Sequence, residues 1–169
     1  SKYKEERTNI LPEGVEKKEE VSSSVCSTEL RRIVIPSHWK SIPQCLLKDS
    51  KTIEVPENNP YFMTIDGVIY SKDKRKLIRY SRKMKEESFT IPEEVEEIGS
   101  YAFVYCSYLT DVTIPKKVNK IQDNTFYYCS DLCNVLFLSE DTIIIQPDGF
   151  VGCSKVHYFA ANSPDLRVL

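Results

Sequence analysis

The six cysteines are the side chains whose type and spacing come closest to a chemical site. Three of them recur at intervals of 23 and 24 residues, at Cys106, Cys129 and Cys153. Zinc sites need closely spaced pairs of Cys or His, and Cys129 with Cys133 has neither that spacing nor a nearby histidine. Equivalent places in a repeat instead suit small, buried, inward-facing thiols. We therefore predict free core thiols. The alternatives are a metal site and a disulfide that involves Cys26, Cys45 or Cys133.

Other catalytic arrangements have less support. His38 and His157 are the only histidines, and they lie far apart in the chain without a nucleophile motif beside either one. The carboxylates of the 93–97 segment fill polar gaps between apolar residues, which is typical of a solvated face. No glycine-rich loop is present that would hold a phosphate group. The sequence therefore predicts no catalytic residue, no cofactor, no metal site and no enzyme.

Composition and charge exclude several classes of protein. Hydrophobic residues make up 41% and charged residues 28% of the chain, which excludes collagen-like and wholly disordered proteins. The formal net charge is -2, whereas phosphate binding needs an excess of Lys and Arg on one face, so we predict no nucleic-acid partner. No apolar run of about 18 residues occurs, so we predict no transmembrane segment.

One local basic run, at 71–85, stands out against this balance. Acidic residues follow it at once, at Glu86 and Glu87. We interpret the run as a solvated hairpin and linker, with a docking patch as the alternative.

A repeat of about 23 residues organises the second half of the chain. Phe103, Phe126 and Phe150 each precede one of the recurring cysteines by three residues. Other apolar residues recur at fixed offsets: Val95 and Val118; Ile98, Ile121 and Ile145; Leu109, Leu132 and Val156; and the pairs Ile91-Pro92 and Ile114-Pro115. Such self-similarity predicts a solenoid, in which each coil buries its apolar face against its neighbours.

The same spacing occurs upstream. Seven positions reproduce the later intervals: Leu30, Ile33, Ile35, Pro36, Trp39, Ile42 and Leu47. A still earlier, eroded copy is predicted from Leu11, Pro12 and Val15, with Cys26 in the cysteine position. Between the good copies, two short apolar runs at 68–70 and 77–80 flank a polar turn, and the pair Asp66-Gly67 precedes them. This pattern predicts a β-hairpin that decorates the solenoid.

These features divide the chain into five segments. They are a charged N-terminal segment with an eroded repeat or cap (1–29), a first clear repeat (30–60), an inserted β-hairpin and linker (61–87), three repeats (88–159) and a C-terminal end (160–169). Open solenoid ends expose apolar residues, so we expect the two end segments either to cap the stack or to favour dimerisation.

The units 91–115 and 114–135 resemble BspA-type leucine-rich repeats in repeat length, Ile-Pro, Ala-Phe and Cys. The inserted segment 66–80 resembles a hairpin common between repeats of that family. Thr125 and Gly149 depart from the pattern, since each replaces the Ala that precedes Phe. The resemblance covers about residues 30–159. It implies a leucine-rich-repeat solenoid, mainly parallel β with short helical or 3-10 turns per coil, and one inserted β-hairpin.

Residue alternation predicts which side chains face the core. Along 109–114, Val112 and Ile114 fall on one face, and Asp111 and Thr113 fall on the other. Three residues before the recurring Phe, a polar residue such as Ser100 could cap one short helical turn, for example at 101–105.

The outward positions beside each inner Val or Ile form the candidate protein-binding face: Arg32, Val34, Ser88, Thr90, Asp111, Thr113, Asn134 and Leu136. Their small, polar or mildly apolar side chains fit an adaptable protein contact, and an ordinary solvated sheet is the alternative. Tyr105 and Tyr128 occupy equivalent places in adjacent coils and form a secondary candidate. The alternative for them is a ring packed over the core edge with its hydroxyl in water.

We therefore predict a protein-protein interaction module with a protein partner. The resemblance implies a surface or secreted adhesin of mucosal bacteria or protists that attaches to extracellular matrix or host cells. An intracellular, cytoplasmic interaction scaffold is the second hypothesis, and the lack of an N-x-S/T acceptor favours it slightly. A repeat arm of a larger enzyme is the third. The chain starts at Ser1 without a Met, so we expect removed upstream residues, and the missing signal peptide leaves the compartment open.

Overall fold

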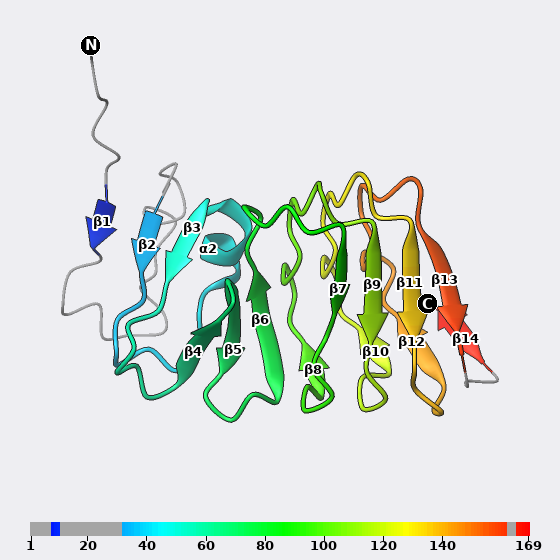
Figure 1. Ribbon diagram of the computed structural model, residues 1–169, viewed down its shortest axis with the longest axis horizontal. Helices are drawn as coiled ribbons and strands as arrows, with labels where there is room; N and C mark the ends of the chain where they lie inside the picture. The colour runs from blue at the N-terminus through cyan, green and yellow to red at the C-terminus, as the bar shows by residue number, and fades with distance from the viewer. Residues whose placement is uncertain (1–7, 11–31, 162–164) are drawn as a thin grey trace, which may run out of the picture.

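The computed structural model describes residues 8–10, 32–161 and 165–169 of the chain, as an elongated stack of coils. Strands of successive coils lie side by side along its length (Figure 1). This stacking confirms the predicted solenoid, because each coil buries its apolar face against the next. Leu30 and the eroded copy at Leu11, Pro12, Val15 and Cys26 lie outside the described residues.

The repeats after residue 87 begin with the strands of one parallel sheet. In spatial order these strands are β7 (Ser88–Thr90), β9 (Asp111–Ile114), β11 (Asn134–Phe137) and β13 (His157–Ala160). Each pair is in register, so that Phe89, Val112 and Val135 face one another along the stack. The alternation that placed Val112 and Ile114 inward is confirmed, since both are buried.

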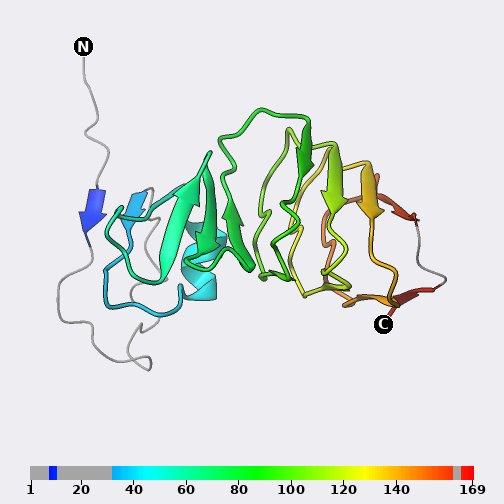
Figure 2. The same cartoon turned by 60° about the horizontal axis from the view of Figure 1, so that its bottom comes forward.

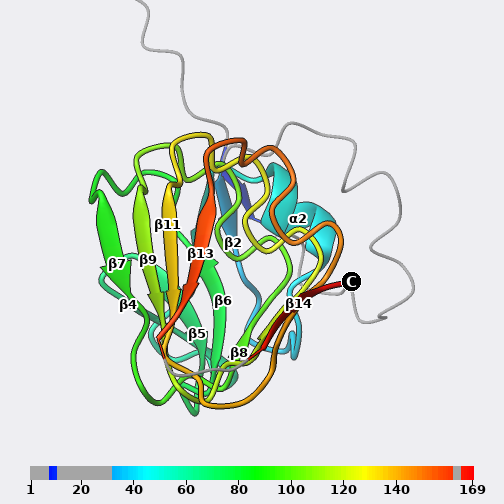
Figure 3. The same ribbon diagram turned by 90° about the vertical axis from the view of Figure 1, so that its right-hand side faces the viewer.

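After each of these strands the chain forms one more strand, and these further strands make up a second wall of the solenoid. They are β8 (Glu97–Ile98), β10 (Lys120–Ile121), β12 (Ile143–Ile145) and β14 (Leu166–Val168). The last three form a parallel sheet, while β8 joins a separate sheet with the strands that precede it. Viewed along the stack, the two walls lie on different sides of the core (Figure 3).

The third wall consists of turns. Alternate residues donate backbone hydrogen bonds to the next coil, as from Tyr101 N to Asn124 O (3.0 Å) and from Phe103 N to Thr125 O (2.9 Å). The residues between them bond back within their own turn, as from Ala102 N to Gly99 O (3.2 Å). Tyr101 and Tyr105 have φ values of 59° and 54°, so the turn expected at 101–105 is a series of tight turns and not a continuous right-handed helix.

The N-terminal unit has its own parallel sheet and its own core. Its sheet contains β1 (Thr8–Ile10), β2 (Arg32–Val34) and β3 (Thr52–Glu54) in that order. The short helix α2 (Gln44–Asp49) closes the coil between β2 and β3, where the repeat spacing places the short helical turn expected in each coil. The apolar positions that repeat spacing matched here are buried: Ile33, Ile35, Trp39, Ile42 and Leu47.

The inserted segment forms three strands: β4 (Phe62–Ile65), β5 (Val68–Ser71) and β6 (Lys76–Tyr80). The expected β5–β6 hairpin is present, and Asp66-Gly67 forms the turn that joins it to the additional strand β4. The expectation that the hairpin decorates the solenoid was wrong. Strand β6 pairs in parallel with β8, so the inserted segment extends the second wall of the solenoid (Figure 2).

Both faces of β5 and β6 are buried. Leu77 and Tyr80 pack into the core of the later coils, whereas Ile69 and Ile78 pack into the core of the N-terminal unit. Two-sided burial explains the nearly continuous apolar runs at 68–70 and 77–80, because a strand with one solvated face would alternate. The segment therefore separates two cores.

A stack of aromatic rings runs through the larger core. Phe103, Phe126 and Phe150 lie with ring centroids 4.7 and 4.8 Å apart and with nearly parallel planes. Thr125 and Gly149 replace the Ala that precedes Phe in the repeat pattern, and the surrounding contacts explain both replacements. The hydroxyl of buried Thr125 donates to Gln122 O at 2.9 Å, and a Cβ on Gly149 would lie 3.1 Å from Ile121 Cγ2.

Candidate functional site

The recurring cysteines are core residues. Cys106, Cys129 and Cys153 are free and buried. The thiol of Cys129 donates to Phe103 O at 2.7 Å, and that of Cys153 donates to Phe126 O at 2.9 Å, so each thiol contacts the preceding coil. Hydrogen bonding between neighbouring thiols, together with burial, raises the pKa of Cys129 and Cys153. The Cys129 and Cys153 thiols therefore remain protonated and unreactive.

The remaining described cysteines differ from one another. Cys133 is free and only half-buried. Cys45 is disulfide-bonded. The disulfide alternative therefore applies to Cys45 and not to Cys133. Within the ranges 8–10, 32–161 and 165–169, no group of three or more His, Cys, Asp or Glu side chains could hold a metal ion.

The structure brings six of the eight predicted face residues together on one sheet. Ser88, Asp111 and Asn134 are in register on β7, β9 and β11. One strand position further along, Thr90, Thr113 and Leu136 form a second row. All six are exposed or half-buried, as outward positions should be. We call these two rows, with their continuation on β13, the strand face.

Asp111 is the most structured polar group of the strand face. Its carboxylate accepts hydrogen bonds from Thr110 Oγ1 at 2.6 Å and from Asn134 Nδ2 at 2.7 Å. These two bonds, that from Thr110 first, lower the pKa of Asp111. The carboxylate therefore stays charged well below neutral pH and links two coils at the surface.

Arg32 and Val34 do not join this face. They lie on β2, whose sheet contains β1 and β3 and is separate from the sheet of β7 to β13. The guanidinium of Arg32 forms two hydrogen bonds with the Glu54 carboxylate, at 2.7 and 2.9 Å. Equal repeat spacing hid this difference, because spacing alone does not show where one sheet ends and another begins.

The sequence missed the C-terminal continuation of the strand face. His157 lies in register with Asn134, and Phe159 lies in register with Leu136. His157 is exposed, and the Phe159 side chain is 51% exposed. Adding one repeat length to Asn134 and Leu136 would have located both residues. The strand face is thus polar on β7 and adds an exposed aromatic ring on β13.

The secondary candidates lie on the turn wall. Tyr105 and Tyr128 are 39% and 49% exposed, and their ring centroids are 5.9 Å apart. The ring of Tyr128 also covers Gly152 of the next coil, where an added Cβ would lie 2.8 Å from the ring. The rings therefore contact successive coils and still expose much of their surface to solvent.

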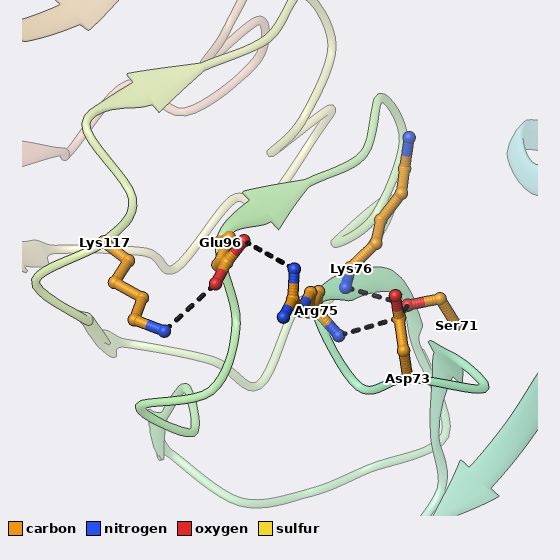
Figure 4. Close-up of polar contacts among 6 residues, drawn as sticks. All are labelled: Ser71, Asp73, Arg75, Lys76, Glu96 and Lys117. Carbon is orange, nitrogen blue, oxygen red and sulfur yellow. Dashed lines mark hydrogen bonds and ion pairs between the residues drawn. The ribbon is translucent and has the colours of Figure 1, made fainter.

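A charged network fixes the β5–β6 turn to the neighbouring coils (Figure 4). Asp73 accepts hydrogen bonds from Ser71 Oγ (2.6 Å) and Arg75 N (3.1 Å), which lower its pKa. Glu96 pairs with Lys117 Nζ at 3.0 Å and with Arg75 Nη1 at 3.9 Å. This part of the basic run at 71–85 is therefore solvated and ion-paired, as expected of a hairpin turn.

A cavity of about 530 Å³ opens between the N-terminal unit and the second wall. Ile42, Phe62 and Ile78 contribute apolar surface, and Lys40, Gln44 and Gln122 contribute polar groups. No sequence pattern indicated this cavity, since its lining comes from segments far apart in the chain. Its lining contains no His or Cys, and its Lys76 and Glu97 form an ion pair at 2.6 Å.

Comparison with known proteins identifies the class. The family model described as the BspA type leucine rich repeat region (6 copies) matches residues 79–166. The chain therefore belongs to the BspA-type leucine-rich-repeat family, whose repeats form a scaffold for protein interactions and not an enzyme fold. No curated protein matches the chain.

Three solved structures are similar to this chain. The pneumococcal vaccine antigen PcpA is 19% identical, with a TM-score of 0.49 over 83% of this chain and 56% of that one. A leucine-rich repeat protein from Eubacterium ventriosum is 20% identical, with a TM-score of 0.47 over 81% and 50%. A leucine rich cell surface protein from Faecalibacterium prausnitzii is 16% identical, with a TM-score of 0.38 over 80% and 49%. The chain thus spans about half the length of these proteins.

In the part of the chain that the structure describes, no helix has the length and apolar character needed to cross a bilayer.

Proposed function

We propose that this chain is an adhesion module of the cell surface or extracellular space, which binds a protein of the extracellular matrix or of a host cell through the strand face. The register of the outward residues carries the proposal. Ser88, Asp111 and Asn134 form one row, and Thr90, Thr113 and Leu136 form the other, on a sheet whose inward residues are fully used in packing.

The composition of the strand face suits a protein partner. Hydroxyl, amide and carboxylate groups on β7 and β9 offer hydrogen bonds, and Leu136 and the exposed Phe159 offer apolar contact at the other end. Protein interfaces combine an apolar centre with a polar rim in this way. A flat row repeated along several coils also fits an extended protein surface better than a small molecule, which needs a concave site.

The disulfide at Cys45 supports the location. Disulfides persist in oxidising compartments and are rare in the cytosol, where thiols are kept reduced. This observation favours the adhesion module over the intracellular scaffold. Mass spectrometry of the chain isolated from its native cells, after thiol blocking, should show Cys45 oxidised. A fully reduced Cys45 would favour the intracellular scaffold instead.

Binding to a panel of immobilised matrix proteins and to host cells tests the proposal. The triple substitution Thr113→Ala, Asn134→Ala and Leu136→Ala should lower affinity at least tenfold, because it removes side chains from both rows. A matched control is Lys116→Ala with Lys120→Ala, which removes exposed side chains from β10 and the turn before it. Equal binding by both variants, or no binding by the wild-type chain, would refute the adhesion proposal.

A further inference from the structure

Two exposed tyrosines occupy backbone positions that favour glycine. Tyr105 and Tyr128 stand at the same place in consecutive turns, with φ values of 54° and 55°. The next coil has Gly152 at this place, with φ 79°. Glycine adopts this left-handed conformation freely, whereas a residue with a Cβ does so at an energetic cost. Gly152 shows that the coil closes without a side chain here, so the fold alone does not require these rings.

The rings form one continuous surface. Tyr127 lies 5.8 Å from Tyr105 and 4.7 Å from Tyr128, measured between ring centroids, and Tyr105 lies 5.9 Å from Tyr128. We call these three residues the tyrosine patch. It spans the turns of two coils, on a wall different from that of the strand face.

Two cations from other elements lie over the tyrosine patch. Arg82, which follows β6, places its Cζ 5.5 Å from the centroid of the Tyr105 ring, and Lys48 of α2 places its Nζ 5.2 Å from that of Tyr127. Within the described residues neither cation forms a salt bridge with a carboxylate. Burial lowers the pKa of Arg82, and the Asp49 carboxylate is the least of the charges that oppose this shift.

A third cation lies behind them. Arg79 is 3% exposed, and both Arg79 and Arg82 donate to the carbonyl oxygen of Ser50 at the end of α2. Arg79 Nη1 and Arg82 Nε are buried without a hydrogen-bond partner. Burial, and to a smaller extent the adjacent Arg82, lowers the pKa of Arg79 to about 10. The region therefore carries positive charge that the described part of the chain leaves uncompensated.

We propose that the tyrosine patch, with Arg82 and Lys48, is a second contact surface that binds an acidic segment of a partner protein. Tyrosine and arginine are enriched at the energetic centres of protein interfaces, because a rigid ring and a planar guanidinium give much contact for little lost freedom. A carboxylate of the segment pairs with Arg82 or Lys48, and its apolar side chains lie against the rings. The surface shares protein binding with the proposed function but uses different residues, so each can fail alone.

Charge decides the kind of partner. An acidic segment supplies the carboxylates that the cations lack, and its charge-assisted hydrogen bonds are stronger where the rings exclude water. A polyanion such as a sulfated glycan or a nucleic acid would need a longer row of exposed cations than these two provide.

Panning a phage library of random dodecapeptides on the whole folded chain provides a defined probe. We expect the enriched peptides to contain Asp or Glu beside apolar residues, and to bind more weakly as salt is raised. Their synthetic forms, measured by fluorescence anisotropy, should lose at least tenfold in affinity for the double variant Tyr105→Gly, Tyr128→Gly, and about fivefold or more for Arg82→Gln.

The glycine substitutions suit the test because they relieve the left-handed backbone and should leave the chain folded, as a thermal melt checks. Tyr108→Ser is the matched control, since Tyr108 is 52% exposed and lies outside the patch. It should leave peptide affinity unchanged, as should the strand-face triple variant. Enriched peptides that lack acidic residues, or that bind the glycine variants as well as wild type, would overturn the proposal. So would tighter binding of a heparin oligosaccharide than of any peptide, lost in the same variants.

Discussion

The coils at 88–161 and the N-terminal unit at 32–55 place apolar residues at the same intervals, yet they close their coils differently. In the later coils, Phe103, Phe126 and Phe150 stack on one another, and turns bond each coil to the next. In the N-terminal unit, α2 replaces the turns, and Leu47 takes the place of the phenylalanine. Equal spacing therefore predicts burial, but the side chains at each position decide how a coil couples to its neighbours.

The three-stranded segment β4–β6 sharpens this contrast, because it separates the two cores. The later coils depend on neighbours of their own kind, while the N-terminal unit rests on β5 and β6 and has a disulfide at Cys45. We expect the two regions to respond to mutation as separate units of local stability.

The largest expected effect comes from Phe126→Ala. Phe126 is fully buried between two stacked rings, so its removal leaves a cavity that two coils share. The loss should be about 3–5 kcal/mol in the free energy of unfolding, measured by urea denaturation.

Amide hydrogen exchange locates the damage. With Phe126→Ala, protection should fall on β9, β11 and β13 and persist on β2 and β3. Leu47→Ala, the matched change in the N-terminal unit, should give the reverse pattern at a cost of about 2–5 kcal/mol. A uniform loss of protection in either variant would show that the cores are one cooperative unit.

A smaller effect is expected from Gly152→Ala, which tests coupling through the turn wall. The added Cβ would approach the Tyr128 ring to 2.8–3.0 Å at a residue with φ 79°. We expect a loss of about 2 kcal/mol in a thermal or urea melt, from contact and backbone strain together.

The double variant Gly152→Ala with Tyr128→Gly separates these two causes. Removing the ring should recover about half of the loss, and the coupling energy from the double-mutant cycle measures the inter-coil contact. Additive effects of the two substitutions would mean that Tyr128 does not couple these coils.

The smallest effect is expected from Asn134→Ala, which removes one of two hydrogen bonds to Asp111. The pKa of Asp111 is lowered in the folded chain, so the carboxylate adds stability above its unfolded pKa of about 3.9 and loses it as pH falls through the folded pKa. The substitution should raise the Asp111 pKa in an NMR titration.

Because Asp111 is close to solvent, the accompanying loss should be only about 0.5 kcal/mol near pH 7 and should vanish below the folded pKa. An unchanged Asp111 pKa would show that the Thr110 hydroxyl alone holds the carboxylate. Thr110→Val provides that comparison, since it removes the other side-chain donor.

The repeat spacing by itself determined the solenoid, the inward residues and most of the strand face. A chain with a period of about 23 residues and fixed apolar offsets buries its apolar residues when equivalent residues of successive coils stack, and the outward residues then align in rows. That is why the phenylalanines, the three buried thiols and the rows through Asp111 and Thr113 could be located before the fold was known.

Tertiary structure alone decided three other matters. Arg32 and Val34 lie on a separate sheet, and the segment at 62–80 separates two cores. Lys48 and Arg82 lie over the rings of the tyrosine patch. The physical reason is common to all three. Spacing along the chain records which residues face inward within a coil, whereas contacts between non-equivalent segments leave no period in the sequence.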